Sequence, residues 1–176
     1  MKNLIRSIAL ILLLASFSKP ALSQWTQRQN LPGTVRTFAT GFSINNTIYV
    51  MGGYDGSLLY SDVWAYDPTL DTWTQKGDFP GGNRSASTAF TIGNKAYMGT
   101  GNDGNEYLKD FWEYEPVSDT WTQLADFPGF EREEAVSFCI GNKGYVGTGQ
   151  TFVVTPNGSF TTTYDDLYEY DPALNI

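Results

Sequence analysis

Residues 64–73 read Trp64-Ala65-Tyr66-Asp67-Pro68-Thr69-Leu70-Asp71-Thr72-Trp73. Trp64 and Tyr66 lie two positions apart, so in a strand both side chains point to the same face, and both residue types favour strands. Asp67 and Pro68 are typical of the start of a turn, because an Asp side chain bonds to the turn's own backbone and Pro fixes φ. The segment therefore predicts two short strands joined by a tight turn.

This pattern recurs 48 residues further on and again near the end of the chain. Other landmarks recur in the same register, so each unit is expected to hold a Trp strand, an Arg-led strand, a strand ending in Gly and the aromatic strand. Such a fixed spacing predicts a repeat protein. The aromatic segment recurs as Trp112–Pro116 and Tyr168–Pro172, and the Trp strand occurs as Trp25-Thr26-Gln27, Trp73-Thr74-Gln75 and Trp121-Thr122-Gln123. The Arg position is filled by Arg36, Arg84 and Arg132, and the Tyr position of the Gly-ended strand by Tyr49, Tyr97 and Tyr145.

The composition of the 176-residue chain agrees with many short strands. It contains 11 Tyr, 11 Phe, 5 Trp and 18 Gly, a mixture typical of strands separated by turns, and we expect almost no helix. The absence of His removes the commonest metal ligand and general base, so no metal and no cofactor are expected. Cys139 is the only cysteine and cannot form an internal disulfide.

Residues 1–23 have the layout of a secretory signal peptide. Lys2 and Arg6 precede the apolar run at 8–14, and the small residues Ala21 and Ser23 suggest cleavage before Gln24. The apolar run is too short for a spanning helix, so we expect a secreted or periplasmic protein with no membrane span after cleavage. The mature chain is more acidic than the net charge of −8 of the full sequence, which makes nucleic acid an unfavourable partner.

The repeat unit resembles the Kelch repeat, whose features are an Arg-led strand, a strand ending in paired Gly, a strand ending in Tyr-Asp-Pro, and a following Trp. The resemblance covers residues 25–176, as repeats of about 25–72, 73–120 and 121–176. It implies an all-β fold, a β-propeller of four-stranded blades around a channel. Three repeats are fewer than the four to eight blades of most propellers, so either the chain continues beyond Ile176 or copies form a ring by homo-oligomerisation.

Alternating strand direction predicts that one face of the disc carries the candidate ligand-binding residues. The loops that enter the Arg strands and those that leave the Gly-ended strands fall on this face, where function usually lies. The third loop, 150–165, is longer than the others and reads as a β-hairpin with Asn157-Gly158 in its turn. The candidate rim residues are Arg36, Arg84, Arg132, Glu131, Glu133, Phe152 and Phe160; a structural role for the repeated arginines is the alternative.

Two classes of function remain open. The favoured one is a non-enzymatic binding module that holds a protein or glycan ligand on its loop face. The alternative comes from the resemblance, because some exported Kelch proteins are sugar-active enzymes, including sialic-acid epimerases and copper-dependent galactose oxidases. The copper enzymes need His ligands, which this chain lacks. An epimerase needs an acid/base pair, for which Glu131 or Glu133 with Arg132 is the candidate, and no catalytic residue is assigned.

Overall fold

The computed structural model describes residues 24–174, so the expected signal peptide at 1–23 lies outside the described residues. This part of the chain contains thirteen strands and no helix. No helix among these residues is therefore long and apolar enough to cross a membrane. The prediction of an all-β fold is confirmed.

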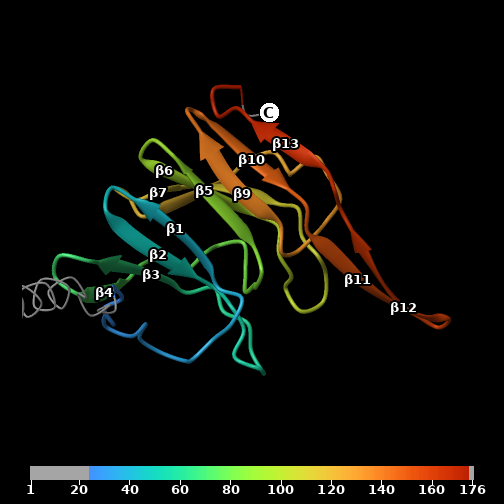
Figure 1. Ribbon diagram of the computed structural model, residues 1–176, viewed down its shortest axis with the longest axis horizontal. Coiled ribbons are helices and arrows are strands. Elements are labelled where there is room, and N and C mark those ends of the chain that lie inside the picture. Colours follow the sequence, from blue (N-terminus) through green and yellow to red (C-terminus); the bar gives the residue numbers. More distant parts are fainter. Residues whose placement is uncertain (1–23, 175–176) are drawn as a thin grey trace, which may run out of the picture.

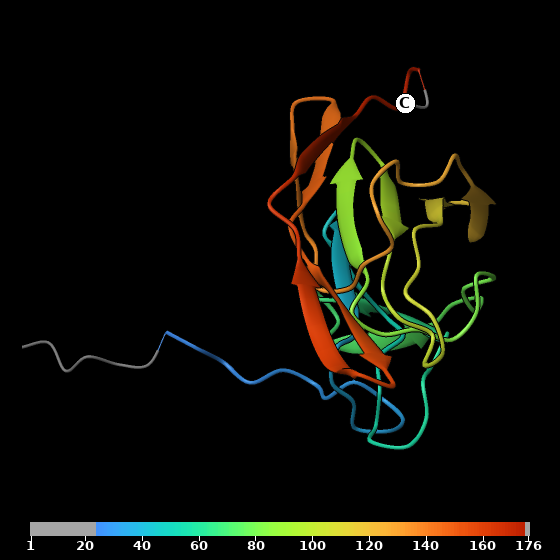
Figure 2. The same ribbon diagram turned by 90° about the vertical axis from the view of Figure 1, so that its right-hand side faces the viewer.

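Three antiparallel sheets fan out from one side as blades of a partial β-propeller (Figures 1 and 2). Blades 1 and 2 have four strands each in chain order, whereas blade 3 has three and carries a separate two-stranded hairpin. The strands are β1 (Thr40–Ile44), β2 (Thr47–Met51), β3 (Val63–Asp67) and β4 (Thr72–Gln75) in blade 1; β5 (Thr88–Ile92), β6 (Lys95–Gly99), β7 (Phe111–Glu115) and β8 (Thr120–Gln123) in blade 2; β9 (Val136–Ile140), β10 (Lys143–Gly147) and β13 (Leu167–Tyr170) in blade 3; and β11 (Gln150–Thr155) and β12 (Gly158–Thr163) in the hairpin.

The predicted pairing of each aromatic strand with the Trp strand after the turn is confirmed, because β3 pairs with β4 and β7 pairs with β8. Two other details of the expectation differ from the structure. Residues 25–27 form no strand, because no described strand lies beside them. The arginines also do not open their strands: Arg36 lies in the loop before β1.

The predicted turns are confirmed at the level of single hydrogen bonds. The Asp67 carboxylate accepts the Thr69 amide at 2.7 Å, and the Tyr66 hydroxyl donates to Asp71 at 2.6 Å. Asp71 adopts a left-handed φ of 54°, which reverses the chain within the turn. The inner hairpins of all three blades close with two residues, at 45–46, 93–94 and 141–142.

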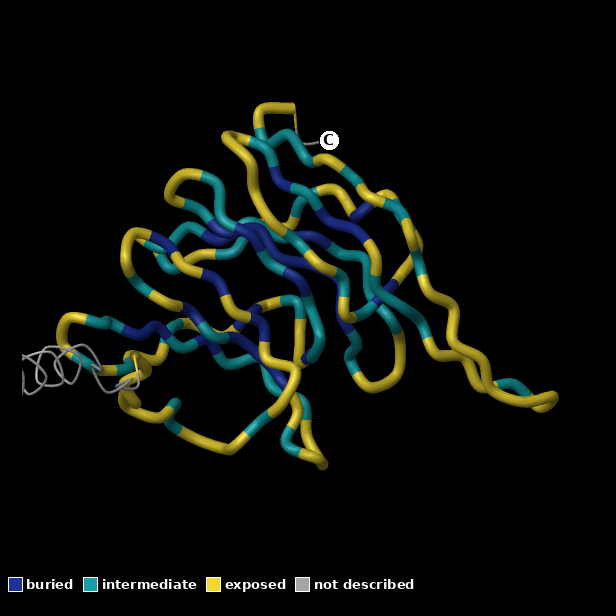
Figure 3. The backbone as a smooth tube through the Cα atoms, in the orientation of Figure 1, coloured by how far each residue is buried: buried dark blue, intermediate teal, exposed yellow. Residues whose placement is uncertain are grey.

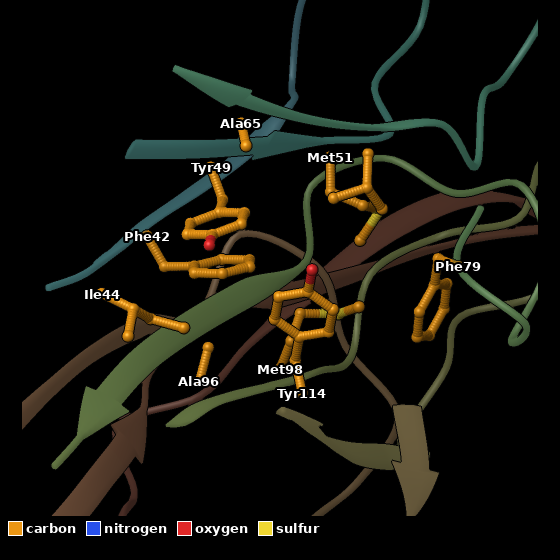
Figure 4. Close-up of a cluster of buried hydrophobic side chains, with 10 residues drawn as sticks. Phe42, Ile44, Tyr49, Met51, Ala65, Phe79, Ala96, Met98 and Tyr114 are labelled. Atoms are coloured by element: carbon orange, nitrogen blue, oxygen red, sulfur yellow. The ribbon is translucent and has the colours of Figure 1, made fainter. Parts of the chain in front are cut away.

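The first core lies between blades 1 and 2 (Figure 4). Phe42 and Tyr49 of blade 1 stack at 5.1 Å between ring centroids, and Tyr114 of blade 2 meets their edges at 6.1 and 5.5 Å. Trp121 packs against Tyr114 at 4.7 Å and Phe79 at 4.9 Å. Large aromatic side chains buried in this way supply roughly 2–3 kcal/mol each, so blade contact is the main source of stability.

The second core, between blades 2 and 3, repeats this arrangement. Phe90 stacks on Tyr97 at 5.5 Å, and Tyr170 of blade 3 contacts both rings. The third stacked pair, Phe138 and Tyr145, lies on the outer face of blade 3, where no described segment covers it. Phe138 is 44% exposed, whereas Phe42 and Phe90 are 7% and 4% exposed. Figure 3 shows the change from buried inner strands to an exposed outer edge.

Main-chain hydrogen bonds join the blades close to the propeller axis. The Ala86 amide donates to the Phe38 carbonyl at 2.8 Å, and the Glu134 amide donates to the Ala86 carbonyl at 2.9 Å. These three equivalent residues all have left-handed φ angles of 55–57°. The blades are thus held in a fixed relation by backbone atoms and not only by side chains.

A buried Arg–Asp pair closes the loop end of every blade. Arg84 donates two hydrogen bonds to Asp110, at 2.7 and 2.8 Å, and a third to the Thr100 carbonyl at 3.3 Å. Its guanidinium lies 4.7 Å above the Phe79 ring, and the residue is 1% exposed. The same pairing joins Arg36 to Asp62 and Arg132 to Asp166. Each pair connects the loop before a blade to the loop before its aromatic strand.

Replacing Asp110 by Asn is expected to destabilise the protein by about 3 kcal/mol or more. The substitution leaves the Arg84 cation buried without its counter-charge, and breaking a buried pair on one side is costly. Chemical denaturation of both proteins measures the difference. Asp78→Asn, which removes the same charge from an exposed position, should change the free energy of unfolding little. Equal stability of Asp110→Asn and the parent chain would contradict a structural role for the pair.

Asp166 should make stability fall in acid. The hydrogen bonds from Arg132 lower the pKa of Asp166, so its ionised form is favoured in the folded state. Because the pKa of Asp166 is lower in the folded state, its ionised carboxylate stabilises the fold at every pH above the unfolded Asp pKa of about 3.9. This stabilisation is lost as the pH falls through the lower pKa of the folded state. The difference in Tm between the parent chain and Asp166→Asn should therefore be large near neutrality and shrink below about pH 4. A constant difference would contradict the assignment.

Candidate functional site

The loop face is the edge of the fan from which the loops between β2 and β3, between β6 and β7, and the β11–β12 hairpin extend (Figure 1). Isolated bridges hold the entering and leaving loops of each blade side by side, and they pair Thr37 with Tyr54, Ser85 with Asn102 and Glu133 with Gln150. The predicted grouping of these loops on one face is thereby confirmed.

Short turns stabilised by Asp side chains give the first two loops their shape. The Asp55 carboxylate accepts the amides of Ser57 and Leu58, both at 2.7 Å, and the Tyr60 hydroxyl at 2.6 Å. Asp103 accepts the amides of Asn105 and Glu106 at 2.8 and 2.7 Å. The Tyr60 bond lowers the pKa of Asp55, and the Glu106 amide lowers that of Asp103. Both carboxyls are thus kept ionised, and the loops are preorganised.

A groove of about 640 Å³ lies between these loops near the propeller axis. Its lining combines aromatic and aliphatic side chains with amide and carboxyl groups. This combination suits a ligand that is held by ring contacts and oriented by a few hydrogen bonds. The lining residues are Phe38, Tyr54, Ser57, Leu58, Leu59, Asn83, Ser85, Asn102, Asp103, Gly104, Asn105, Glu133 and Glu134.

Glu133 and Glu134 distinguish blade 3 from the other two at the wall of this groove. The equivalent residues are Thr37 and Phe38 in blade 1 and Ser85 and Ala86 in blade 2. Burial raises the pKa of Glu133, and the neighbouring Glu134 carboxylate raises it further. Glu134 accepts a hydrogen bond from the Gln150 side chain at 2.9 Å. Glu133 therefore favours retaining a proton more than an ordinary glutamate does.

The structure separates the other predicted charged residues from the groove. Arg36, Arg84 and Arg132 direct their guanidinium groups into the Arg–Asp pairs, and Arg132 is 0% exposed with its guanidinium between Phe127 and Tyr164. Glu131 lies outside the groove and pairs with Lys109 at 3.3 Å. The Glu131 amide and then Lys109 lower the pKa of Glu131. Among the predicted charged residues, only Glu133 lines the groove.

The predicted hairpin of the third loop is present, with a small change in its turn. Pro156 and Asn157 form the two-residue turn, and Gly158 begins β12 with a φ of 130°. Phe152 and Phe160 are both about half exposed, but they lie on opposite faces of the hairpin, because Phe160 pairs with Val153. The hairpin contains no charged residue between 151 and 164. It therefore presents an uncharged apolar surface beside an acidic groove.

The sequence analysis did not predict the Asp partners of the arginines or the aromatic residues Tyr54 and Phe38 that line the groove. A signal for the partners is present, because Asp62, Asp110 and Asp166 each stand two residues before the aromatic residue that opens the repeated strand pattern. No such sequence signal marks Tyr54 and Phe38, since neither aromatic side chain recurs in the other repeats. Among the described residues, no group of three or more His, Cys, Asp or Glu side chains could hold a metal ion.

Comparisons with known proteins agree with this architecture. Residues 12–149 match the family model of the KLHDC2/KLHL20/DRC7 Kelch-repeats domain. No curated protein matches the chain. One solved structure that it resembles is titled "Structure of YjhT", with 17% sequence identity and a TM-score of 0.66 over 83% of this chain. The matched region is 56% of that structure, so the chain spans just over half of its length. The family match covers more than half of the chain, which therefore belongs to the Kelch-repeat family.

Proposed function

We propose that this protein is an exported binding module that takes a protein or glycan ligand in the loop-face groove. The observation that carries the proposal is the groove's composition, in which the aromatic residues Phe38 and Tyr54 line the same cavity as several amide and carboxyl groups. The groove is formed by preorganised loops, which lowers the entropy lost when a ligand binds. The signal-peptide pattern at 1–23 supports an extracellular or periplasmic location.

The charges around the groove favour a neutral or cationic ligand. Asp103, Glu133 and Glu134 contribute carboxyl groups, and no Lys or Arg side chain lines the groove. An anionic sugar would meet like charges, and the arginines that could offset its carboxylate are committed to internal pairs. A neutral oligosaccharide fits better, because its hydroxyl groups can donate to the carboxylates and its ring faces can lie on the aromatic side chains.

The hairpin extends the binding surface beyond the groove. Its base adjoins the groove at Gln150, which pairs with Glu133 and bonds to Glu134. Exposed Phe152 and Val154 on one face, and Phe160 on the other, offer apolar contacts without charge. Such a surface is suited to a ligand larger than the groove itself, either a longer glycan or a protein that presents one.

A second candidate function is a sugar-isomerising enzyme. It rests on the raised pKa of Glu133, since a carboxyl that holds its proton above the usual range can serve as a general acid and base. Arg132 is not its partner, because the guanidinium is bound to Asp166. In this function Glu133 would protonate and deprotonate the sugar, and burial, followed by the neighbouring Glu134, would keep its pKa raised.

The binding function predicts that loop-face changes weaken ligand capture without affecting folding. The probe is a panel of immobilised neutral and acidic oligosaccharides together with an unfractionated set of exported proteins. The double variant Phe152→Ser, Phe160→Ser should reduce binding about tenfold or more, since buried aromatic contacts dominate interface energies. Its Tm should stay nearly unchanged, because both side chains are exposed. Tyr54→Ala tests the groove in the same assay.

The matched control is Val117→Ser. Val117 is almost fully exposed and lies in the β7–β8 turn, at the opposite end of the blades from the loop face. It should bind every ligand of the panel as the parent chain does. Binding that is lost in Val117→Ser but retained in the hairpin and groove variants would place the site on the other face. Failure of all panel members to bind would also contradict the proposal.

The enzymatic alternative has a separate test. Proton NMR can follow the exchange between the two anomers of a neutral hexose in the presence of the protein. A catalysed rate should be lost in Glu133→Gln and should show a protonation step above the ordinary Glu pKa of about 4.3. Glu131→Gln, outside the groove, should have the parent rate. A rate equal to that without protein would leave binding as the function.

A further inference from the structure

A polar pocket of about 200 Å³ lies on the face of blade 1 that is turned toward blade 2. This volume is far more than the roughly 10–15 Å³ that a cavity needs to hold one water molecule, so a small ligand has room there. Side chains of β2, β3 and β4 and of the residue after β4 form its walls. The lining residues are Thr47, Tyr49, Ala65, Asp67, Thr74 and Lys76.

The same position in blade 2 is filled by an ion pair. The Lys95 ammonium donates to one oxygen of Glu113 at 2.5 Å, and the Tyr97 hydroxyl donates to the other oxygen at 2.9 Å. Glu115 lies 4.0 Å from the same ammonium. Blade 3 has the three bonded groups in the same contacts, contributed by Lys143, Tyr145 and Glu169.

In blade 1 two small side chains replace this ion pair, whereas the tyrosine is kept. Ala65 stands opposite Tyr49 in the sheet, at the position of the glutamate, and Thr47 takes the position of the lysine. Figure 4 shows Ala65 next to Tyr49. The Ala65 methyl group cannot accept a hydrogen bond from the tyrosine hydroxyl. The pocket is thus the space that the side chains of the ion pair fill in the other blades.

The charges around the pocket suit a ligand that carries both an ammonium and a carboxylate. Asp67 stands where blade 2 has Glu115, so a ligand ammonium beside it would restore the contact that the lysine makes there. Lys76 replaces an uncharged leucine of blade 2 and adds a positive charge to the lining. It can bind a ligand carboxylate together with the Tyr49 hydroxyl.

The Tyr49 hydroxyl is suited to donate to that carboxylate. Tyr49 is 5% exposed, and burial, followed by the Asp119 carboxylate, raises its pKa, so the hydroxyl keeps its proton. Asp119 itself accepts hydrogen bonds from the Tyr114 hydroxyl and the Gly77 amide, at 2.8 and 3.0 Å. Its charge is therefore partly balanced, and it repels a ligand carboxylate less than a free carboxylate would.

A small α-amino acid holds the two charged groups in the geometry of the ion pair. Its ammonium and its carboxylate are bonded to the same carbon atom, so one carboxylate oxygen lies in close contact with the nitrogen. The other oxygen points away from the nitrogen and can accept a hydrogen bond from a tyrosine hydroxyl. The two oxygens of Glu113 divide the lysine and the tyrosine between them in the same way.

We propose that the blade 1 pocket binds a free α-amino acid with a small side chain. The ligand would take the place of the ion pair, with its ammonium next to Asp67 and its carboxylate between Tyr49 and Lys76. A zwitterion leaves the total charge of the pocket unchanged, so no uncompensated charge is buried. The pocket shares no residue with the loop-face groove, and the proposal does not depend on the proposed function.

The first test compares ligands on the parent chain. Glycine and L-alanine are the amino-acid probes, and acetate and methylamine each carry only one of the two charges. NMR of the protein should show that both amino acids shift the amide signals of Thr47, Ala65 and Thr74. The single-charge probes should bind about tenfold more weakly, because each leaves a charged group of the pocket without its hydrogen bond. Absence of binding by both amino acids, signal changes confined to other residues, or equal binding of acetate would overturn the proposal.

The second test fills the pocket with the residues of blade 2. The double variant Thr47→Lys, Ala65→Glu rebuilds the ion pair, so it should lose amino-acid binding and keep its Tm. Tyr49→Phe should raise the Kd about tenfold, because it removes one hydrogen bond to a charged group. Tyr97→Phe, which removes the equivalent hydroxyl of blade 2, is the matched control and should bind as the parent chain does. Binding retained in the double variant, or weakened equally by both Phe variants, would contradict the assigned site.

Discussion

The Arg–Asp pair at the loop end of each blade is the interaction on which the loop face depends. A guanidinium that is 0–1% exposed, as in Arg84 and Arg132, is stable only because one carboxylate matches its charge, and that carboxylate and two main-chain carbonyls accept hydrogen bonds from it. The pair joins the same entering and leaving loops that the isolated bridges hold side by side. Because the pair is present in all three blades, the loops of every blade are anchored in the same way.

This shared Arg–Asp anchor distinguishes structural positions of the repeat from positions that are available for function. A residue that recurs in every copy, such as the arginine, is committed to holding the blade. Positions that differ between copies can vary because their side chains are not part of that framework. Glu133 and Glu134 and the β11–β12 hairpin are of the second kind, and together with the first two loops they form the groove and its extension.

The sequence predicts most of this fold, because its repeats encode it locally. The two-residue turns, the Asp-capped turn after Tyr66 and the third-loop hairpin all follow from residue types at fixed positions. The pairing of β4 with β3 follows as well, since the tight turn after Tyr66 joins the two strands directly. Thr100 and Thr148 replace Gly52 and adopt left-handed φ angles of 60° and 59°, a conformation that their β-branched side chains do not predict. The site was predicted less well, because burial of the arginines depends on Asp partners 26 or 34 residues away.

The contacts between blades explain how the groove could acquire its carboxyl pair at little cost to the fold. Phe38, Ala86 and Glu134 have nearly the same φ, and the bonds that join them use only backbone amides and carbonyls. Their side chains can therefore differ in size and charge without altering the junction. The Phe38 ring of blade 1 and the Glu134 carboxylate of blade 3 then line one groove, and Ala86 at the same position of blade 2 carries only a methyl group. Variation at this one position of the repeat changes the chemistry of the groove while the backbone geometry of the junctions stays constant.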